Sequence, residues 1–352
     1  MEPRIIEKEA LLIAGVAGGG DETGKAWDAY MKLEKISPLK NKTGEEGYEI
    51  RLYPGEGPGE VHVGVSVKDA GIPAEYKAFF LPASLYAEFE IYPSKGYDSS
   101  NAEINNWLSE NAEVYKQSRI IDKNYAVEVY DDRYKGEKDP ESVVGILIPI
   151  TRTDTYNMPG IKAEQTAEMG RRIEEFTGAE VRAKVMTGGD EAGASPDPVK
   201  RALWFKDALE RLDALIDRET REQIMHACGC HCQGVFSKEM EDARDRRRFH
   251  KTEEEFLKHE LQPPHGAGVR FERDGDIIYN YYAPRQYGMR CYCYLIGGLP
   301  DGVNASPTHC QCSRAWQQKY WEGALGRPVR VELGETAISS GTEECKFIIH
   351  LR

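Results

Sequence analysis

The sequence predicts an α+β protein of two domains, and three observations lead to that class. The chain has 352 residues, enough for two ordinary hydrophobic cores. In its first half the order strand, helix, strand, strand occurs twice. In its second half lie all eight cysteines, beginning at Cys228, so the two halves are expected to differ in their chemistry.

The first copy of the repeat opens with a long apolar strand over residues 4–17, which a run of glycines ends. A helix around Trp27 follows, with its apolar residues on one face. Strands over 48–53 and 60–67 complete the copy, and the second of them has valines at alternate positions.

The second copy has the same order of elements. A long strand region over 76–92, broken by Pro82, precedes a helix around Trp107, and strands over 125–130 and 143–150 follow. The period of about 75 residues is longer than that of solenoid repeats, so we expect a pseudo-twofold pair. Such a pair would join its two sheets, place both helices on one face and leave a cleft between the copies.

Several stretches of this repeat carry a family resemblance. They are the opening strand, the Trp27 helix, the strand over 76–90, the helix over 103–110, and Val127-Glu128-Val129-Tyr130 followed by 146–150. Together, over residues 1–152, they resemble the GyrI-like effector-binding domain, the small-molecule module of drug-sensing transcription regulators and of stand-alone proteins. The resemblance implies a GyrI-like fold in which Glu128 faces an aromatic-lined cleft.

A glutamate in an apolar cleft has a specific chemistry. Its carboxylate is costly to bury unless a cation or a hydrogen-bond donor meets it, and aromatic faces favour the same cation. We therefore expect a small organic ligand, cationic or aromatic, as the partner. Burial should raise the pKa of Glu128, which also suits a general acid or base. On residue pattern alone, a solvent-facing glutamate on an edge strand is the other interpretation.

Six aromatic residues are candidates for the wall of this cleft, and about half of them should be ordinary core residues. They are Tyr48, Tyr86, Phe89, Tyr92, Trp107 and Tyr130. Tyr130 would in addition orient an electrophile if the cleft were catalytic.

The charge and the N-terminal sequence limit the partners. A formal net charge of -13 argues against a nucleic-acid-binding face, which needs clustered Lys and Arg. The chain begins directly with the first strand, so the DNA-binding helices of the regulators are not expected here. The apolar run over 10–17 is too short for a signal peptide or for a membrane span of about 20 residues. We therefore expect a cytosolic protein with reduced thiols, and the pattern predicts no oligomeric state.

The domain boundaries follow from composition. Residues 1–152 form the small-molecule-binding domain, 153–198 a linker with one helix and a mobile loop, and 199–352 a cysteine-rich α/β domain. Within the linker we expect a helix over 161–176, a strand over 180–186 and a loop over 188–198. The last domain should contain helices over 199–217, 219–228, 236–249, 253–261 and 313–325 and strands over 268–271, 277–283, 291–296, 329–333 and 345–350. Gly229 should end the helix before it as a left-handed cap.

The cysteines predict a metal site. They are Cys228, Cys230 and Cys232, then Cys291 and Cys293, then Cys310 and Cys312, and finally Cys345. Zinc takes four soft or borderline ligands, so these thiols exceed the need of one ion and leave room for a second ion or an iron–sulfur cluster. The Cys-x2-Cys spacing that is usual for zinc is absent. Reactive redox thiols and inert buried cysteines are the alternatives. Three histidines could add ligands, namely His226, His231 and His309. Each of them could instead be a surface residue or a member of a polar network.

The region from about 290 to 351 carries a second resemblance. Arg290-Cys291, the Cys310-x-Cys312 stretch and the tail over 334–347 resemble vinyl-4-reductase-like and aminothiazoline-carboxylate-hydrolase-like domains. The resemblance implies zinc held by Cys345 and by one cysteine of the 310/312 pair. Ala337 stands where such domains place another cysteine, so cysteines from 228–232 or 291–293 would have to complete the site.

Three functional hypotheses follow from these observations. The leading one is a small-molecule-binding protein whose second domain binds a metal through cysteines. The second is a hydrolase in which Glu128 acts as general base and Tyr130 or another tyrosine orients the electrophile. The third is a sensor whose thiols or metal respond to oxidant.

Overall fold

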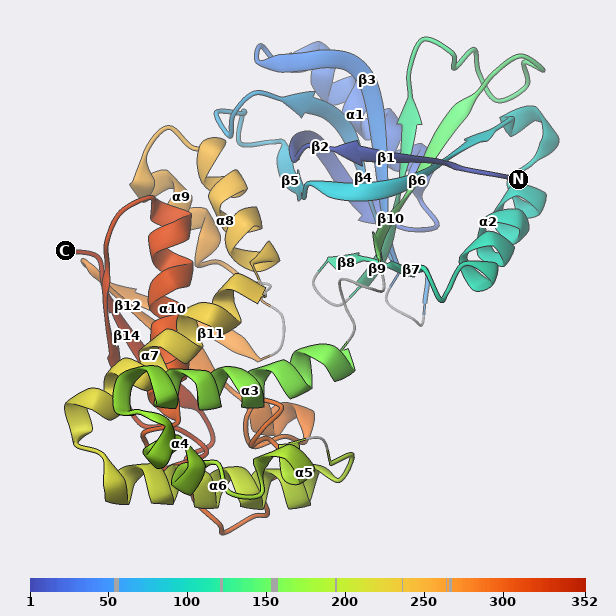
Figure 1. The fold of residues 1–352 in the computed structure, drawn as a ribbon. Coiled ribbons are helices and arrows are strands. Elements are labelled where there is room, and N and C mark those ends of the chain that lie inside the picture. The colour runs from blue at the N-terminus through green and yellow to red at the C-terminus, as the bar shows by residue number, and fades with distance from the viewer. Residues whose placement is uncertain are drawn as a thin grey trace. The chain divides into compact units, whose positions relative to one another are not determined.

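The computed structural model describes residues 1–53, 57–120, 123–152, 158–193, 195–235, 237–263, 265 and 268–352. The chain forms two compact units, and Figure 1 traces it through them. The first unit contains Met1–Tyr156 with Asp245–Phe256, and the second contains Asn157–Arg244 with Leu257–Arg352. Each unit has an antiparallel sheet and helices, so the predicted α+β class is confirmed.

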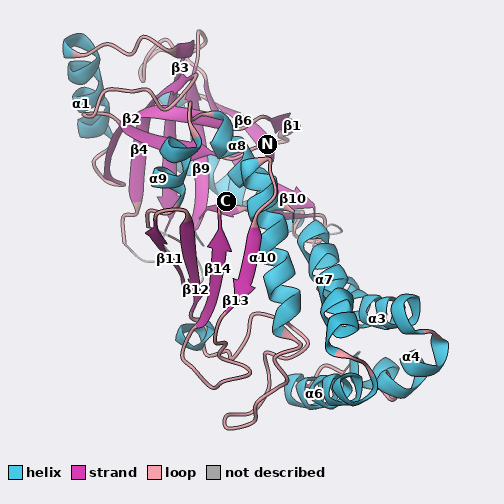
Figure 2. Ribbon diagram, turned by 90° about the vertical axis from the view of Figure 1, so that its left-hand side faces the viewer, coloured by secondary structure: helices cyan, strands magenta, loops and turns pink. Residues whose placement is uncertain are grey.

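One large antiparallel sheet builds the first unit (Figure 2). Its strands are β1 (Arg4–Lys8), β2 (Leu11–Gly19), β3 (Lys42–Tyr53), β4 (Glu60–Val67), β5 (Lys77–Leu81), β6 (Ser84–Ile91), β7 (Tyr115–Gln117), β8 (Arg119–Ile120), β9 (Lys123–Tyr130) and β10 (Val144–Arg152). They run in the order β1-β6-β10-β9-β3-β4-β2-β5, while β7 pairs with β10 and β8 with β9.

The strand order confirms the internal repeat. Strands β2, β4 and β3 of the first copy correspond to β6, β10 and β9 of the second, and β3 pairs with β9 where the copies meet. The outermost strands are exchanged, because β5 pairs with β2 and β1 pairs with β6. The single strand expected over 4–17 is therefore two strands, since its halves have different partners. Pro82 separates β5 from β6 in the same way, because it has no backbone N–H for the ladder.

Two helices cover one face of this sheet. The first, α1 (Thr23–Ile36), buries Tyr30 in a cluster with the valines of β4. The second, α2 (Asp98–Glu110), buries Trp107, whose ring lies edge-on to that of Phe89 at 5.7 Å between centroids. That both helices share a face follows from the cross-strand register.

A row of directly paired residues crosses the sheet on the helix-bearing face. Val63 pairs with Glu49, Glu49 with Glu128, Glu128 with Ile146, and Ile146 with Phe89. Directly paired residues of antiparallel strands have their side chains on the same face. The row therefore joins the α1 cluster at Val63 to the α2 cluster at Phe89, with two carboxylates at its centre.

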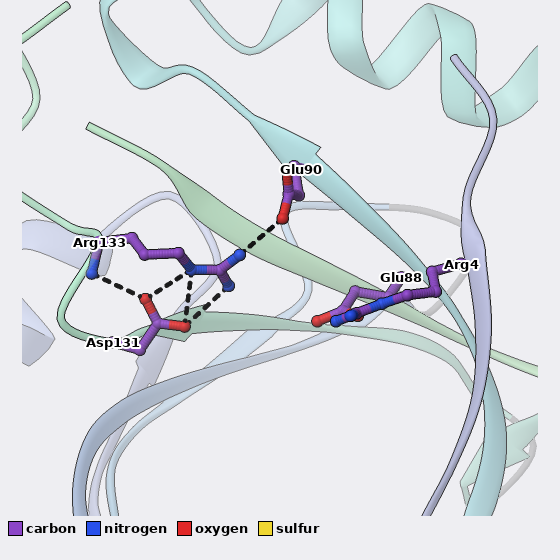
Figure 3. Close-up of polar contacts among 5 residues, drawn as sticks. All are labelled: Arg4, Glu88, Glu90, Asp131 and Arg133. Atoms are coloured by element: carbon purple, nitrogen blue, oxygen red, sulfur yellow. Dashed lines mark hydrogen bonds and ion pairs between the residues drawn. The ribbon is translucent and has the colours of Figure 1, made fainter. Parts of the chain in front are cut away.

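Ion pairs near β6 form a second charged region of the first unit, which Figure 3 shows. Arg133 contacts Asp131 at 2.7 Å and Glu90 at 2.6 Å. Arg4 of β1 is the direct cross-strand neighbour of Glu88 of β6, and their side chains form an ion pair. Both glutamates lie at positions of β6 that alternate with those packed on α2, so they point to the other face of the sheet.

The second unit combines helices with a smaller sheet. Its elements are α3 (Met158–Thr177), α4 (Ala179–Val185), α5 (Gly189–Gly193), α6 (Pro198–Leu215), α7 (Arg218–Val235), α10 (Cys310–Leu325), β11 (Val269–Asp274), β12 (Ile277–Tyr282), β13 (Arg330–Leu333) and β14 (Cys345–His350). The sheet has the order β11-β12-β14-β13, and α10 packs along β13 and β14 (Figure 2). Helices α8 (Lys238–Arg248) and α9 (Glu253–Glu260) belong partly to each unit.

The segment between the two expected domains is helical and packs into the second unit. The strand expected over 180–186 is wrong, because this stretch forms α4. Val181 and Val185 are one helical turn apart and both contact the core formed with Leu209 of α6. The loop expected over 188–198 contains the short helix α5. None of the helices in the described ranges combines the length and apolar character of a membrane span.

Two expectations around the cysteines are also wrong. Gly229 does not end a helix, because α7 continues to Val235. A Cβ at Gly229 would lie 2.2 Å from the carbonyl oxygen of Cys312, so the glycine is required by close helix packing instead. Residues 291–296 are not a strand, since the Cys293 carbonyl accepts hydrogen bonds from the N–H groups of Ile296 and Gly297 and closes a turn.

Candidate functional site

Two glutamates lie side by side at the centre of the large sheet. Glu49 of β3 and Glu128 of β9 are directly paired where the two copies of the repeat meet. Glu49 is 0% and Glu128 is 7% exposed. Like charges that face each other across strands are destabilising, and burial adds the cost of desolvation. The pair is a candidate site because this cost requires compensating groups around it.

Arg51 supplies the compensating positive charge. It lies two residues after Glu49 on β3, so both side chains leave the strand on the same face. The guanidinium contacts Oε1 of Glu49 at 2.5 Å, and Nε donates to Oε1 of Glu128 at 3.1 Å. Its other nitrogens donate to the Gly20 carbonyl at 3.1 Å and to Oγ1 of Thr23 at 2.9 Å. The Arg51 side chain is 29% exposed, which makes it the most exposed of the three charged groups.

Two aromatic side chains donate to the remaining carboxylate oxygens. Nε1 of Trp27 donates to Oε2 of Glu49 at 2.9 Å, and the hydroxyl of Tyr130 donates to Oε2 of Glu128 at 2.9 Å. The two rings lie edge-on at 5.5 Å between centroids. Gly47 makes room for this contact, because a Cβ there would lie 2.9 Å from the Trp27 ring. An aromatic wall thus adjoins the charged centre.

The charges of the site do not balance. Two carboxylates and one guanidinium leave one net negative charge when all three are ionised. Burial raises the pKa of Glu128 above its ordinary 4.5 and the charge of Glu49 raises it further, while Arg51 and Tyr130 oppose the shift. Burial and the two carboxylates also raise the pKa of Tyr130, so its phenol keeps the proton and acts as a donor. The centre can therefore take up either a proton or another cation.

More aromatic residues surround Glu128 from the second copy of the repeat. Tyr97 precedes α2, and burial together with the charge of Glu128 raises the pKa of its phenol. The ring of Tyr134 lies edge-on to that of Tyr130 at 4.9 Å. With Trp27 from the first copy, both halves of the repeat contribute aromatic groups to the site.

The aromatic residues that the sequence singles out fall in different places. Tyr130 contacts Glu128 directly. Phe89 and Trp107 are buried on the same face of the sheet, within the α2 cluster. They lie close to the carboxylate row, and their described contacts are those of core residues.

Three other aromatic candidates lie away from Glu128. Tyr48 and Tyr86 belong to the apolar cluster on the opposite face, because Tyr48 is next to Glu49 and adjacent strand residues alternate. Tyr92 is 39% exposed, with Nζ of Lys95 over its ring at 4.5 Å.

Three residues of the site are not among those that the sequence predicts. They are Trp27, Glu49 and Arg51. A signal for the two charged ones was present, since Glu49 and Arg51 alternate with apolar neighbours as Glu128 and Tyr130 do. Two strands with polar residues at alternate positions, each in the corresponding place of a repeat, are expected to meet at its axis.

The structure gathers four of the predicted cysteines around one cavity of the second unit. Cys228, Cys232, Cys293 and Cys312 line it, and we call it the thiol cavity. His231 and His309 also line it, with Glu168 of α3.

The other four cysteines do not line this cavity. Cys291 adjoins it, since its Sγ lies 3.9 Å from Nε2 of His309 and accepts from the N–H of Cys293 at 3.4 Å. Sγ of Cys310 contacts Oγ1 of Thr336 at 3.1 Å, and Sγ of Cys345 accepts from the N–H of Ala337 at 3.4 Å. Cys230 contacts Nε2 of His226 at 3.5 Å. In the part of the chain that the structure describes, no three His, Cys, Asp or Glu side chains are arranged closely enough to hold a metal ion.

Residues 4–150 match the family described as Cass2, integron-associated effector binding protein. The match covers the large sheet with α1 and α2, so the predicted resemblance of this region to effector-binding domains of the GyrI-like kind is confirmed. The comparison with curated proteins finds no significant match. The resemblance of residues 290–351 to vinyl-4-reductase-like domains stays a prediction.

Three solved structures illustrate what this part of the chain is similar to. SAV2435 bound to tetraphenylphosphonium is 17% identical, with 43% of this chain and 94% of that chain covered and a TM-score of 0.34. A hydrolase from Listeria innocua is 14% identical, with 43% and 92% covered and a TM-score of 0.28. The integron cassette protein VCH_CASS2 of Vibrio cholerae is 14% identical, with 43% and 97% covered and a TM-score of 0.25.

Proposed function

We propose that the first unit binds a small organic cation at the Glu49–Glu128 pair. The observation that carries the proposal is the charge balance, with one guanidinium for two buried carboxylates. A ligand cation would neutralise the remaining charge, and the aromatic faces of Trp27 and Tyr130 would favour the same ligand. The match to an effector-binding family over residues 4–150 supports a small-molecule role for this unit.

Arg51 makes the proposed binding an exchange of cations. A ligand that reaches Glu128 meets one oxygen bonded to Arg51 and the other bonded to Tyr130. Because the Arg51 side chain is partly exposed, its guanidinium can turn toward water and release the carboxylates to the ligand. A large organic cation with spread charge is weakly hydrated and loses little on burial, so it competes better than a small inorganic ion. The site therefore selects for apolar bulk around a positive charge.

The test uses two probes of the same shape and opposite charge, tetraphenylphosphonium and tetraphenylborate, titrated calorimetrically into the full chain. We expect the cation to bind and the anion to bind at least about tenfold more weakly, a difference of about 1.4 kcal/mol. Glu128→Gln should weaken cation binding by about 10–100-fold, the range for losing a charged hydrogen-bond acceptor.

The matched control is Glu90→Gln, which removes a carboxylate from the other face of the same sheet. It should leave the affinity for the cation unchanged. Equal binding of the two probes, or equal losses from Glu128→Gln and Glu90→Gln, would contradict the proposal.

A hydrolase remains the second candidate, because a glutamate with a raised pKa suits a general base. Binding is the stronger proposal, since both oxygens of Glu128 already accept hydrogen bonds from Arg51 and Tyr130. Turnover of an ester or amide by the full chain that Glu128→Gln abolishes while cation binding persists would favour the hydrolase.

A further inference from the structure

The thiol cavity is small and has an unusually soft lining. Its volume is about 50 Å³, room for only a few water-sized groups, whereas sites for organic ligands usually begin at about 300 Å³. Helix α7 contributes Cys228 and Cys232, one turn apart, α10 contributes Cys312, and the turn over residues 293–297 contributes Cys293. The size therefore fits an ion and excludes a drug-sized molecule.

The four thiols reach this cavity from three segments of the chain that lie far apart in the sequence. The segments of Cys228 and Cys312 are in close contact, because a Cβ at Gly229 would lie 2.2 Å from the Cys312 carbonyl oxygen. A fifth thiol adjoins the cavity, since Sγ of Cys291 lies 3.9 Å from Nε2 of His309.

One nitrogen of a histidine that lines this cavity has no partner. His309 is 2% exposed, and among the described residues its Nδ1 has no hydrogen-bond partner, while its Nε2 contacts Sγ of Cys291 at 3.9 Å. A neutral imidazole nitrogen is a common metal ligand, and a bound cation would satisfy this buried polar atom.

Two glycines hold the backbone segments that carry the thiols close together. Gly229 lets α7 approach α10, since a Cβ there would meet the Cys312 carbonyl oxygen at 2.2 Å. Gly297 lets the chain fold over the turn at Cys293, since its Cβ would lie 2.5 Å from the Cys291 carbonyl oxygen. The close packing on two sides of the cavity thus depends on residues without side chains.

Positive charge lies next to the cavity as well. Glu168 lines it and is paired with Arg171 at 2.7 Å and with Arg172 at 2.6 Å. The two arginines together carry one more charge than Glu168, which would offset part of the negative charge that several thiolates bring to a divalent ion.

We propose that the thiol cavity binds one thiophilic divalent cation of the zinc class, with ligands drawn from Cys228, Cys232, Cys293, Cys312 and His309. Each thiol that binds releases its proton to solvent, and His309 binds without losing one. Among the described residues no three such side chains are arranged to hold the ion, so binding requires these side chains to turn toward it until each sulfur lies at about 2.3 Å from the metal. This set differs from the one that the family resemblance implies, because Cys345 lies outside the cavity.

The experiment titrates Co²⁺ and then Zn²⁺ into the reduced, chelator-treated full chain without oxygen. We expect one equivalent of Co²⁺ to give sulfur-to-metal absorption and the bands of a tetrahedral site, and Zn²⁺ to remove both. Cys232→Ser and Cys312→Ser should each weaken binding at least about a hundredfold, since the loss of a mere outer-shell partner already costs about 10–100-fold. Cys230→Ser is the matched control on the same helix and should bind as the parent does.

A second measurement on the parent chain avoids variants that fail to fold. Rates of alkylation of each cysteine by iodoacetamide, read by mass spectrometry, should fall with Zn²⁺ at Cys228, Cys232, Cys293 and Cys312 and stay unchanged at Cys230. Three outcomes would each overturn the proposal. They are no binding of Co²⁺ by the fully reduced chain, protection from alkylation at Cys345 and not at Cys232, and a brown protein that contains iron.

Discussion

The two units bury ionisable groups in opposite ways. In the first, Glu49 and Glu128 lie in a sheet that also provides their counter-ion, Arg51. In the second, burial raises the pKa of Cys228 and Cys232 to about 12, so these thiols stay neutral and need no counter-ion. The difference sets what a ligand must displace. A cation has to compete with an arginine at the carboxylates, whereas at the thiols it has to replace protons.

The largest effect is expected from removing the internal cation. Arg51→Ala leaves two facing carboxylates without their partner, and breaking a buried ion pair costs about 3–5 kcal/mol. Because Arg51 is partly exposed, we expect a loss near the lower end, about 3 kcal/mol in the free energy of unfolding. Urea unfolding followed by circular dichroism measures it.

A second substitution makes this prediction specific to charge. Adding Glu49→Gln to Arg51→Ala removes the repulsion between the carboxylates and should recover most of the loss. If Arg51→Ala changes stability by less than about 0.5 kcal/mol, as an ordinary surface substitution does, the carboxylate pair does not depend on it.

The corresponding test in the second unit changes packing and no charge. In Gly229→Ala the new Cβ meets the Cys312 carbonyl, so we expect a loss of about 1–3 kcal/mol, as for other overpacked sites. Gly234→Ala is the control on the same helix, because its Cβ would meet only Nζ of Lys319 at 3.8 Å. The control should gain about 0.5–1 kcal/mol from helix propensity. Equal effects of the two changes would show that α7 and α10 are not in close contact at Gly229.

Much of the first unit could be predicted from local patterns. Strand β4 has the expected bounds because its valines alternate without interruption, and the repeat appears in the sequence as the same order of elements twice. The exchange of β1 and β5 between the copies could not be predicted. Strand pairing between distant residues depends on tertiary contacts, which leave no periodic signal in one segment.

The candidate sites show the same limit. Glu128 and Tyr130 could be named from one stretch of sequence, but the pairing of Glu49 with Glu128 depends on the register of two strands far apart in the chain. The helix end expected at Gly229 is wrong, although glycine after a helical pattern is typical of a cap. In the structure the glycine is required by a neighbour, Cys312, that the local pattern does not contain.

A pH series distinguishes the carboxylate site from an ordinary ion pair. The folded-state pKa of Glu128 is raised, so its protonated form stabilises the fold, and this contribution is present below about 4.5 and lost as pH rises through the folded pKa. Glu128→Gln should therefore be more stable than the parent at neutral pH, with a difference that disappears toward pH 4.5. Chemical unfolding between pH 4.5 and 8 measures it, and a difference that grows on acidification would contradict the shift.

The affinity for an organic cation should change in the opposite direction with pH. Acidification protonates Glu128 and removes the charge that attracts the ligand, so affinity falls as pH drops through the raised pKa. Glu49, Arg51, Tyr97 and Tyr130 face the same carboxyl. The arginine and the two tyrosines keep their protonation states over this range, because the pKa of each is raised. Calorimetric titration of tetraphenylphosphonium should show this pH dependence in the parent, and a much flatter one in Glu128→Gln.

The smallest effect on the free energy of unfolding is expected at the ion pairs of Figure 3. They carry charges like those of the Glu49–Glu128 site but are more exposed, so they test whether burial decides the effect. Glu90→Gln removes one partner of Arg133, but Glu90 is about half exposed and Arg133 keeps Asp131 at 2.7 Å. Exposed pairs contribute about 0–1 kcal/mol, so the free energy of unfolding in urea should change by no more than that. A loss comparable to that of Arg51→Ala would mean that the number of charged partners, and not their burial, decides the energy of such clusters. Such a result would contradict the view that the Glu49–Glu128 pair is sensitive to mutation because it is buried.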